Sequence, residues 1–263
     1  MKSILITGDI HGELERFSKR NFLEYYYKDL KNSDKKDNVI IVCGDFGFIW
    51  AREEDKEEKY ELDILQDKPF TILFVDGNHE NHYRLNHDFL TTNLYGGKVH
   101  KIRDNVYHLM RGEVYTILGK KFFTFGGASS HDITDGILDY EDENWKKKAN
   151  NLYKQGKYRY RVKGLSWWEE EMPSDEEMEH GLENLKLHDN KVNYIITHQP
   201  PEMIMRQLSD NPLDFNAFTS YLQKINDTVD FNTWFAGHMH IDRKIDDKHQ
   251  QMYYKIYTLY EEL

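Results

Sequence analysis

The sequence predicts an α/β fold that is built on a mostly parallel β-sheet. Three short runs rich in β-branched residues, at residues 3–7, 39–43 and 70–75, are each followed by Gly-Asp or Asp-Gly-Asn, which ends a strand at a turn. Two segments between these runs, at residues 13–30 and 52–66, carry the apolar spacing and the Glu/Lys pairs that are typical of helices. Because buried strands that alternate with helices form parallel sheets with right-handed crossovers, this part of the chain predicts a β-α-β-α-β unit.

A second sheet is predicted from a change of pattern near residue 98. Four short strand candidates follow one another there, at residues 99–102, 106–109, 113–118 and 121–125. Gly119-Lys120 suits a tight turn between the last two. This pattern indicates a β-meander that begins a second sheet packed against the first.

The rest of the chain predicts an ordered insertion followed by a return to strands and helices. Residues 139–170 are rich in Tyr, Lys, Asn and Trp without clear periodicity, and we interpret them as an insertion or lid. Ser174 and Glu177 form a capping-box pattern for a helix that ends near residue 188. The remaining candidates are strands at 192–197 and 233–236, a helix at 214–225, and a strand at 253–259 that would close the second sheet. With no linker or repeat between these elements, we expect a single domain over residues 1–263.

Composition indicates a soluble protein and argues against two classes of partner. Of the 263 residues, 39% are hydrophobic and 31% are charged, and the formal net charge is -11. This negative charge opposes binding to nucleic acid or to an anionic membrane, although the basic segments 146–148 and 157–163 could override it locally. No apolar run approaches the roughly 20 residues needed to span a bilayer. The single cysteine, Cys43, excludes an intrachain disulfide, so we expect a protein of the reducing cytoplasm; no pattern indicates its oligomeric state.

Polar residues that can bind metal ions cluster after five of the predicted strands. These candidate ligands are Asp9, His11, Asp45, Asn78, His198, His238 and His240. Because the carboxyl ends of parallel strands meet at one edge of a sheet, we expect these side chains to converge there. Asp9 and His11 can chelate one divalent ion, and Asp45, alone on the neighbouring strand end, suits a bridge to a second ion. The mixed nitrogen and oxygen donors favour Mn, Fe, Zn or Ni over Mg or Ca.

In their order along the chain, these motifs resemble those of the calcineurin-like metallophosphoesterase superfamily. They are Gly8-Asp9-Ile10-His11-Gly12, Gly44-Asp45, Gly77-Asn78-His79-Glu80, His198 and Gly237-His238-Met239-His240, so the resemblance covers residues 8–240. It implies a four-layer α/β/β/α sandwich, the metallo-dependent phosphatase fold. It also implies two divalent metal ions, the first bound by Asp9, His11, Asp45 and His240 and the second by Asp45, Asn78, His198 and His238. His79 would match the catalytic histidine, which stabilises developing charge or protonates the leaving oxygen.

The resemblance implies a hydrolase that acts on a phosphomonoester or a phosphodiester, for which a nucleotide-like compound is one candidate. Two cations would offset the charge of the phosphoryl group and lower the pKa of a bridging water, so that hydroxide can attack without a covalent protein intermediate. The alternatives are a protein Ser/Thr phosphatase, a nuclease, and a catalytically inactive scaffold or binding module. The Ser/Thr subgroup continues its second motif as Gly-Asp-x-Val-Asp-Arg-Gly. Residues 44–50 read Gly-Asp-Phe-Gly-Phe-Ile-Trp instead, without the phosphate-binding arginine.

Four residues outside the ligand set are candidates for contact with the substrate: Arg84, His131, Arg159 and Arg161. An arginine can pair with a phosphate, and His131 lies beside Asp132 in a polar loop. The alternatives are an exposed helix arginine at position 84 and a loop histidine with a local hydrogen bond at position 131.

Other residues near the motifs also have two interpretations. The aromatic residues of the insertion could stack on a base or pack the insertion onto the core; they are Tyr158, Tyr160, Trp167 and Trp168. Glu80 is expected to cap the next helix or to orient His79 rather than to bind a metal ion.

Overall fold

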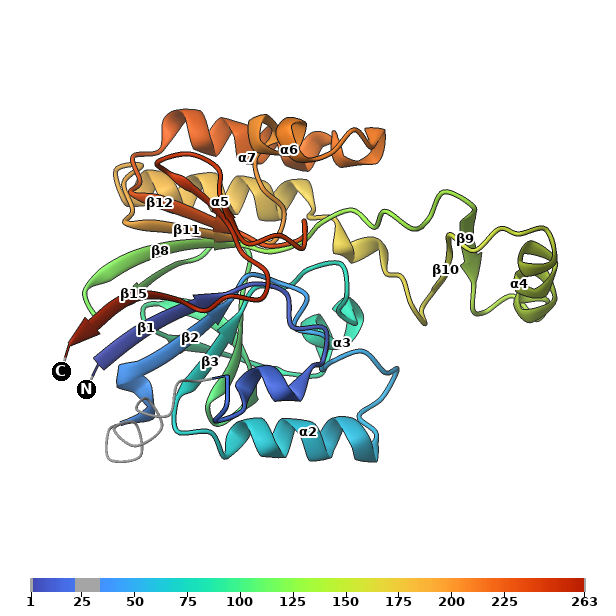
Figure 1. Ribbon diagram of the computed structural model, residues 1–263, viewed down its shortest axis with the longest axis horizontal. Helices are drawn as coiled ribbons and strands as arrows, with labels where there is room; N and C mark the ends of the chain where they lie inside the picture. The colour runs from blue at the N-terminus through green and yellow to red at the C-terminus, as the bar shows by residue number, and fades with distance from the viewer. Residues whose placement is uncertain (1, 22–33, 263) are drawn as a thin grey trace.

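Two β-sheets pack face to face, and helices cover the outer face of each, in the computed structural model, which describes residues 2–21 and 34–262 (Figure 1). The strands of the first sheet are β1 (Lys2–Thr7), β2 (Asn38–Val42), β3 (Thr71–Phe74), β4 (Leu90–Leu94), β5 (Gly97–Arg103), β6 (Val106–Leu109) and β15 (Tyr257–Glu262), in the order β15-β1-β2-β3-β6-β5-β4. The strands of the second are β7 (Val114–Ile117), β8 (Lys120–Phe125), β11 (Tyr194–Thr197), β12 (Thr233–Ala236), β13 (Arg243–Lys244) and β14 (His249–Gln251), in the order β13-β14-β12-β11-β8-β7. The four-layer sandwich implied by the resemblance is confirmed.

The parallel part of the first sheet is formed by the strands that the sequence predicts most directly. β1 pairs with β2, β2 with β3, and β3 with β6, all in parallel. Each of the three predicted runs becomes a strand, with its ends shifted by no more than one residue. Apart from Lys2, all residues of β1, β2 and β3 are buried, because the second sheet covers one face and helices cover the other.

The helices form the two outer layers. Those beside the first sheet are the 3-10 turn η1 (Leu14–Phe17), α2 (Lys56–Gln66) and α3 (His82–His87), and those beside the second are α5 (Asp175–Leu187), α6 (Glu202–Leu208) and α7 (Ala217–Thr228). The capping box of Ser174 and Glu177 is confirmed at the start of α5. α2 begins later than expected, at Lys56, because the Asp55 carboxylate accepts hydrogen bonds from the first free N–H groups of the helix. Within the described residues, no helix is both long and apolar enough to cross a lipid bilayer.

Three apolar clusters fill the spaces between the layers. Ile4 and Ile6 of β1 point between the sheets, where they pack in one cluster with Phe235 of β12. Leu5 points the other way, into the cluster that includes Leu62 of α2. A third cluster lies between the second sheet and helices α5 and α7. The side chains of successive residues in one strand therefore pack into different clusters, because they alternate between the two covered faces of the sheet.

Three expectations about the elements need correction. The predicted meander is divided between the sheets, because β4, β5 and β6 join the first sheet and β7 and β8 the second. The turn between β7 and β8 consists of Leu118 and Gly119, one residue earlier than predicted; both have positive φ, as two-residue hairpin turns require. Of the helix expected at 13–30, the described part holds only η1, and residues 22–30 lie outside the described residues.

The last strand, β15, was expected to close the second sheet and instead pairs with β1 in the first. The segment that leads into β15 turns at residues 253–255, where the Asp242 carboxylate accepts the backbone N–H groups of Tyr253, Tyr254 and Lys255. This turn directs the C-terminal segment to the side of β1 that β2 does not occupy, so the strand supplies hydrogen-bond partners to what would otherwise be a sheet edge.

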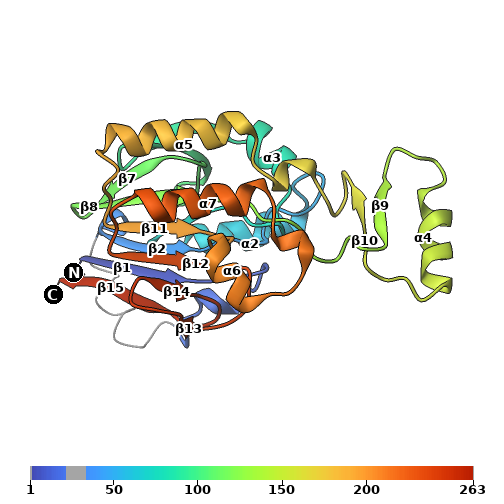
Figure 2. The same ribbon diagram turned by 90° about the horizontal axis from the view of Figure 1, so that it is seen from above.

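Residues 136–163 form an arm that projects from the sandwich (Figures 1 and 2). It consists of β9 (Gly136–Asp139), α4 (Trp145–Lys154) and β10 (Tyr160–Lys163), and β9 pairs with β10 in parallel. The guanidinium carbon of Arg52 in the sandwich lies 4.2 Å from the centre of the Tyr140 ring. This cation–π contact connects the base of the arm to the sandwich. The insertion expected at 139–170 is ordered, and its role as a lid stays a prediction.

Arg84 differs from both sequence-based interpretations, because it is neither exposed nor directed at a substrate cavity. Its side chain, 3% exposed, makes two hydrogen bonds of 2.7 Å with the carboxylate of Glu58, which is 5% exposed. The pair links α3 to α2 on the outer face of the first sheet. Arg84 thus belongs to the packing of the helix layer.

We expect Arg84→Leu to lower the free energy of unfolding by about 3 kcal/mol, because it leaves the Glu58 carboxylate buried without its partner. Urea unfolding of the purified variant measures this change. Lys191→Ala is the matched control, since it breaks the exposed ion pair of Lys191 with Asp230 and should leave stability unchanged. A loss that is equally small in both variants would contradict a structural role for Arg84.

Candidate metal centre

The seven candidate ligands lie together where the carboxyl ends of the two sheets meet. Asp9 and His11 follow β1, Asp45 follows β2 and Asn78 follows β3 in the first sheet; His198 follows β11, and His238 and His240 follow β12 in the second. The sequence predicts that they lie at one edge of a single sheet, whereas in the structure they follow strands of both sheets. The junction of the sheets therefore positions the site.

Several of these residues have a strained backbone conformation, which persists only where tight packing holds it in place. His11, Asp45, His238 and His240 all have positive φ, between 45° and 68°, which non-glycine residues rarely adopt. A side chain at position 77 would place its Cβ 2.1 Å from Oδ1 of Asp45, so this position requires glycine. The strand ends approach one another so closely that the polar groups must converge.

One group of ligand atoms is formed by Asp9, His11, Asp45 and His240. Nε2 of His240 lies 3.1 Å from Oδ2 of Asp9 and 3.0 Å from Nε2 of His11. Nε2 of His11 lies 3.7 Å from Oδ2 of Asp45. Both carboxylates are buried, and the atoms are as close as ligands of a single cation would be.

A second group surrounds Nε2 of His198. This atom lies 3.3 Å from Oδ1 of Asn78, 3.4 Å from Oδ1 of Asp45 and 3.2 Å from Nδ1 of His238. The other ring nitrogen of His198 is 2.8 Å from the carbonyl oxygen of Cys43, so it carries the proton and leaves a lone pair on Nε2. Asp45 faces both groups, with Oδ2 toward the first and Oδ1 toward the second, as a bridging carboxylate must.

The electrostatics of the centre favour the binding of cations. Burial, with the nearby Asp9 carboxylate, raises the pKa of Asp45 well above its usual value. Burial lowers the pKa of His11 to about 4 and that of His238 well below its usual value. These two imidazoles therefore favour the neutral form and offer lone pairs, whereas the hydrogen bond with Asp9 raises the pKa of His240. The carboxylates are crowded together. Divalent cations would relieve this repulsion, and the oxygen and nitrogen donors fit such ions.

His79 lies at the edge of this centre and is held on several sides. Its backbone N–H donates to Oδ1 of Asp45 at 2.8 Å, and its ring stacks on Trp50 with 5.6 Å between ring centres. Its Nε2 lies 3.0 Å from Nη2 of Arg161. Because a guanidinium can only donate, Nε2 of His79 accepts this hydrogen bond and carries no proton. Burial and the charge of Arg161 lower the pKa of His79 to about 3.

Arg161 and His131 line the cavity beside these residues, and the other two substrate candidates do not. The cavity has a volume of about 260 Å³, and its walls are Asp45, Asn78, His79, His131, Asp132, Arg161, His238 and His240. Arg161 reaches it from β10 of the arm, with Nε 2.6 Å from Oδ1 of Asp132. Arg159 is exposed on the arm and pairs through its backbone with Asp135, and Arg84 pairs with Glu58.

Glu80 plays a part that neither sequence-based expectation foresaw. Its carboxylate accepts the backbone N–H groups of Phe46, Gly47 and Gly77, so it joins the loops that follow β2 and β3. Asn81, not Glu80, caps α3. Glu80 therefore holds Asp45 and Asn78 at a fixed separation without facing the ligand groups.

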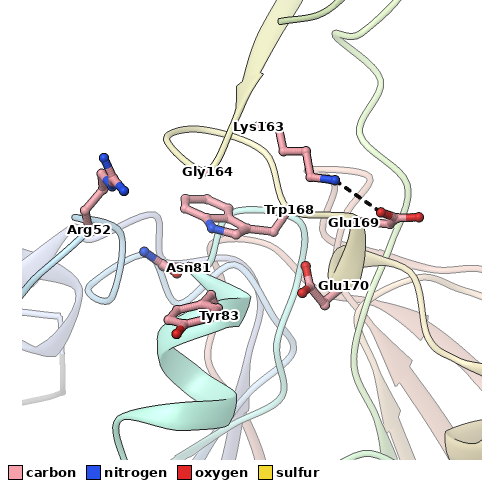
Figure 3. A pocket seen from close by; sticks show the side chains of 8 residues that line it. All are labelled: Arg52, Asn81, Tyr83, Lys163, Gly164, Trp168, Glu169 and Glu170. Carbon is pink, nitrogen blue, oxygen red and sulfur yellow. Dashed lines mark hydrogen bonds and ion pairs between the residues drawn. The ribbon is translucent and has the colours of Figure 1, made fainter. Parts of the chain in front are cut away.

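A second cavity, of about 300 Å³, opens at the root of the arm (Figure 3). It is lined by Arg52, Asn81, Tyr83, Lys163, Gly164, Trp168, Glu169 and Glu170. Figure 3 shows Trp168 between Arg52 and the ion pair of Lys163 with Glu169. Trp168 is only 6% exposed and lies edge-on to Trp50, with 5.4 Å between ring centres, so it packs the arm onto the sandwich.

Sequence reasoning missed two residues at the centre, and each for a physical reason. Trp50 supports the ring of His79, yet in sequence it is one apolar residue after a strand. Asp214 lies within reach of His131 and His238, yet it comes from the turn between α6 and α7 and belongs to no motif. Only the folded chain brings these residues to the site.

Among solved structures, the chain is similar to a protein from Staphylococcus aureus that is provisionally described as a 5′-nucleotidase and was crystallised with alpha-ketoglutarate. The two share 11% sequence identity with a TM-score of 0.41. The match covers 95% of this chain and 48% of the other, so the present chain spans about half the length of that protein. This likeness carries no inference about activity.

No curated protein matches the chain. The family model of the calcineurin-like phosphoesterases matches residues 2–242, which is nearly the whole sequence and includes all seven residues of the candidate metal centre. The chain therefore belongs to the calcineurin-like phosphoesterase family.

Proposed function

We propose that this protein is a metal-dependent phosphoesterase that hydrolyses a phosphomonoester or a phosphodiester at a centre of two divalent cations. The observation that supports this most strongly is the position of Asp45, whose two carboxylate oxygens face two separate groups of ligand atoms. A carboxylate in this position can bridge two ions and so hold them close together, as catalysis at a two-metal site needs. Mn, Fe, Zn and Ni are the candidate metals, because the donors are nitrogen and oxygen.

Each ion would be held by residues from both sheets. Asp9, His11, Asp45 and His240 would bind the first, and Asp45, Asn78, His198 and His238 the second. When bound, the two cations neutralise phosphoryl charge and activate water for attack on phosphorus. The buried carboxylates and the hydrogen bond from His198 to the Cys43 carbonyl orient the donors before any ion arrives.

Arg161 would anchor the phosphoryl group from the side of the arm. Its guanidinium lines the cavity next to His79 and can donate to a phosphoryl oxygen. Asp132 and the carbonyl oxygens of Asn78 and Ser166 fix its orientation. His79, with its lowered pKa, would help to stabilise developing charge as a neutral imidazole rather than protonate the leaving oxygen.

The protein Ser/Thr phosphatase alternative finds less support. Phe46, Phe48 and Ile49, which occupy the segment where that subgroup carries its phosphate-binding arginine, are buried in the outer core of the first sheet. Arg52, the first cation after this segment, contacts Tyr140 at the root of the arm. The cation beside the cavity comes from the arm instead, which favours a substrate class different from that of the Ser/Thr subgroup.

We expect Asp45→Asn to lower metal-dependent hydrolysis of p-nitrophenyl phosphate or bis-p-nitrophenyl phosphate by at least about 100-fold, because the bridge between the ions is lost. The fold should persist, since asparagine tolerates positive φ and can still accept the N–H of His79. Steady-state kinetics with Mn-loaded protein measure the loss. Asp104→Asn, at an exposed position, is the control. Near-normal activity of Asp45→Asn would refute the assignment, and wild-type protein that binds two ions but hydrolyses neither ester would favour the scaffold alternative.

We expect Arg161→Gln to reduce kcat/KM for the better of these two esters by about 10- to 100-fold, because a charge-assisted hydrogen bond to the phosphoryl group is lost. Arg159→Gln is the matched control, since it removes the same charge two residues earlier on the arm, outside the cavity. Equal effects of the two substitutions would show that the arm acts only through its overall charge. Metal content, measured in parallel, should be the same in both variants.

A further inference from the structure

The cavity at the root of the arm, called here the arm-root cavity, has no role in the hydrolysis proposed above. Its volume of about 300 Å³ exceeds the 260 Å³ of the cavity beside the metal centre. Pockets for small molecules have volumes from roughly 300 to 1,000 Å³. The eight residues that line it, labelled in Figure 3, come from both the sandwich and the base of the arm. The arm-root cavity is therefore large enough for part of a small molecule.

Two aromatic rings line this cavity. The side chain of His87 stacks on the ring of Tyr83, with 4.4 Å between ring centres, so it covers one face of that ring. Tyr83 is nevertheless 55% exposed, which leaves the other face accessible. Trp168 is held in place by its edge-on contact with Trp50, and Figure 3 shows the Tyr83 ring below the Trp168 indole. Aromatic surfaces at a cavity favour a planar ligand, because flat rings stack on one another.

The charged groups of the arm-root cavity balance one another. Arg52 and Lys163 are positive, and Glu169 and Glu170 are negative. Each cation already has an acidic neighbour, since Lys163 lies 3.4 Å from Glu169 and Arg52 lies 3.6 Å from Glu141. An anionic or a cationic ligand would therefore have to displace an ion pair or face a like charge. An uncharged ligand can accept hydrogen bonds from the cations and donate to the carboxylates.

Strand β10 connects the arm-root cavity to the metal centre. Arg161 lines the cavity beside the metal centre, and Lys163 lines the arm-root cavity. Because alternate residues of a strand point to the same face and are about 7 Å apart, the two cavities lie next to each other along β10. Trp50 lies between them, with its ring against His79 on one side and against Trp168 on the other. One molecule can therefore reach both cavities.

We propose that the arm-root cavity binds a planar, uncharged heterocycle that belongs to the same substrate as the phosphoryl group. A nucleobase has this chemistry, because it combines flat faces with hydrogen-bond donors and acceptors at its edge. The heterocycle would stack on Tyr83 and Trp168, while the phosphoryl group lies at Arg161. The inference rests on the proposed function for the phosphoryl end of the substrate. It goes beyond that function by naming the class of the remaining part and the residues that select it.

The first test is equilibrium dialysis of the protein against labelled adenosine and against labelled cytidine, neither of which carries a phosphate. We expect saturable binding of one molecule of at least one of them per chain. Tyr83→Ala should weaken this binding by about 10-fold, because an aromatic stacking partner is lost. Tyr60→Ala is the matched control, since Tyr60 is an exposed tyrosine on α2 that lines neither cavity, and it should bind as the wild type does.

The second test links the arm-root cavity to the metal centre. It measures inhibition of hydrolysis of the better p-nitrophenyl ester by AMP, by CMP and by ribose 5-phosphate, which lacks only the base. We expect at least one nucleotide to inhibit at a concentration about 10-fold lower than ribose 5-phosphate does, and Tyr83→Ala to remove this difference. Inhibition by ribose 5-phosphate should be the same in the wild type, Tyr83→Ala and Tyr60→Ala.

The proposal is overturned if neither nucleoside binds in a saturable manner, or if Tyr83→Ala binds them as the wild type does. It is also overturned if the ester is hydrolysed but AMP and CMP inhibit no better than ribose 5-phosphate, because the two cavities would then act separately. If thermal unfolding shows that Tyr83→Ala does not fold, Lys163→Gln replaces it, and unchanged binding there has the same meaning. Wild-type protein that binds a nucleoside but hydrolyses neither ester would contradict the proposed function and support the heterocycle site.

Discussion

Two buried carboxylates, Asp9 and Asp45, hold together the place where the two sheets meet, and the rest of the centre depends on how the backbone satisfies them. The N–H of His238, after β12 of the second sheet, donates to Asp9, after β1 of the first. The N–H of His79 donates to Asp45, so β3 is joined to β2. Each carboxylate thus links two strand ends, and the histidines gather around the charge that remains unsatisfied.

The centre combines parts of very different origin. The ligand groups come from strand ends that the sandwich fixes firmly, since β1, β2 and β3 are buried on both faces. The cation beside the cavity comes from the projecting arm, through Arg161. Glu80 supports the ligand groups from a loop, because its carboxylate joins two loops through their backbone N–H groups. Under the proposed function, ion binding, substrate contact and support are thus carried by separate segments.

The seven candidate ligands could be chosen from the sequence because each depends on a local pattern. A buried strand that ends in Gly-Asp, as at Asp45, places its polar residue at the strand end whatever the rest of the chain does. The sheet membership of a strand has no such local signal, which is why the meander was assigned to one sheet and β15 to the wrong one. Asp214 and the partner of Arg84 could not be predicted either, because both depend on contacts between segments that are distant in sequence.

The arm has a consequence for how such a protein can diversify. Its two strands pair with each other and not with either sheet, so its length and tip can change by insertion or deletion while the sandwich keeps its register. Arg161 nevertheless lies on this segment and reaches the cavity. Under the proposed function, mutations that reshape the arm would therefore alter which ester is accepted before they alter ion binding or hydrolysis. In evolutionary terms, the proposed substrate recognition would be free to drift while the proposed catalytic chemistry stays constant.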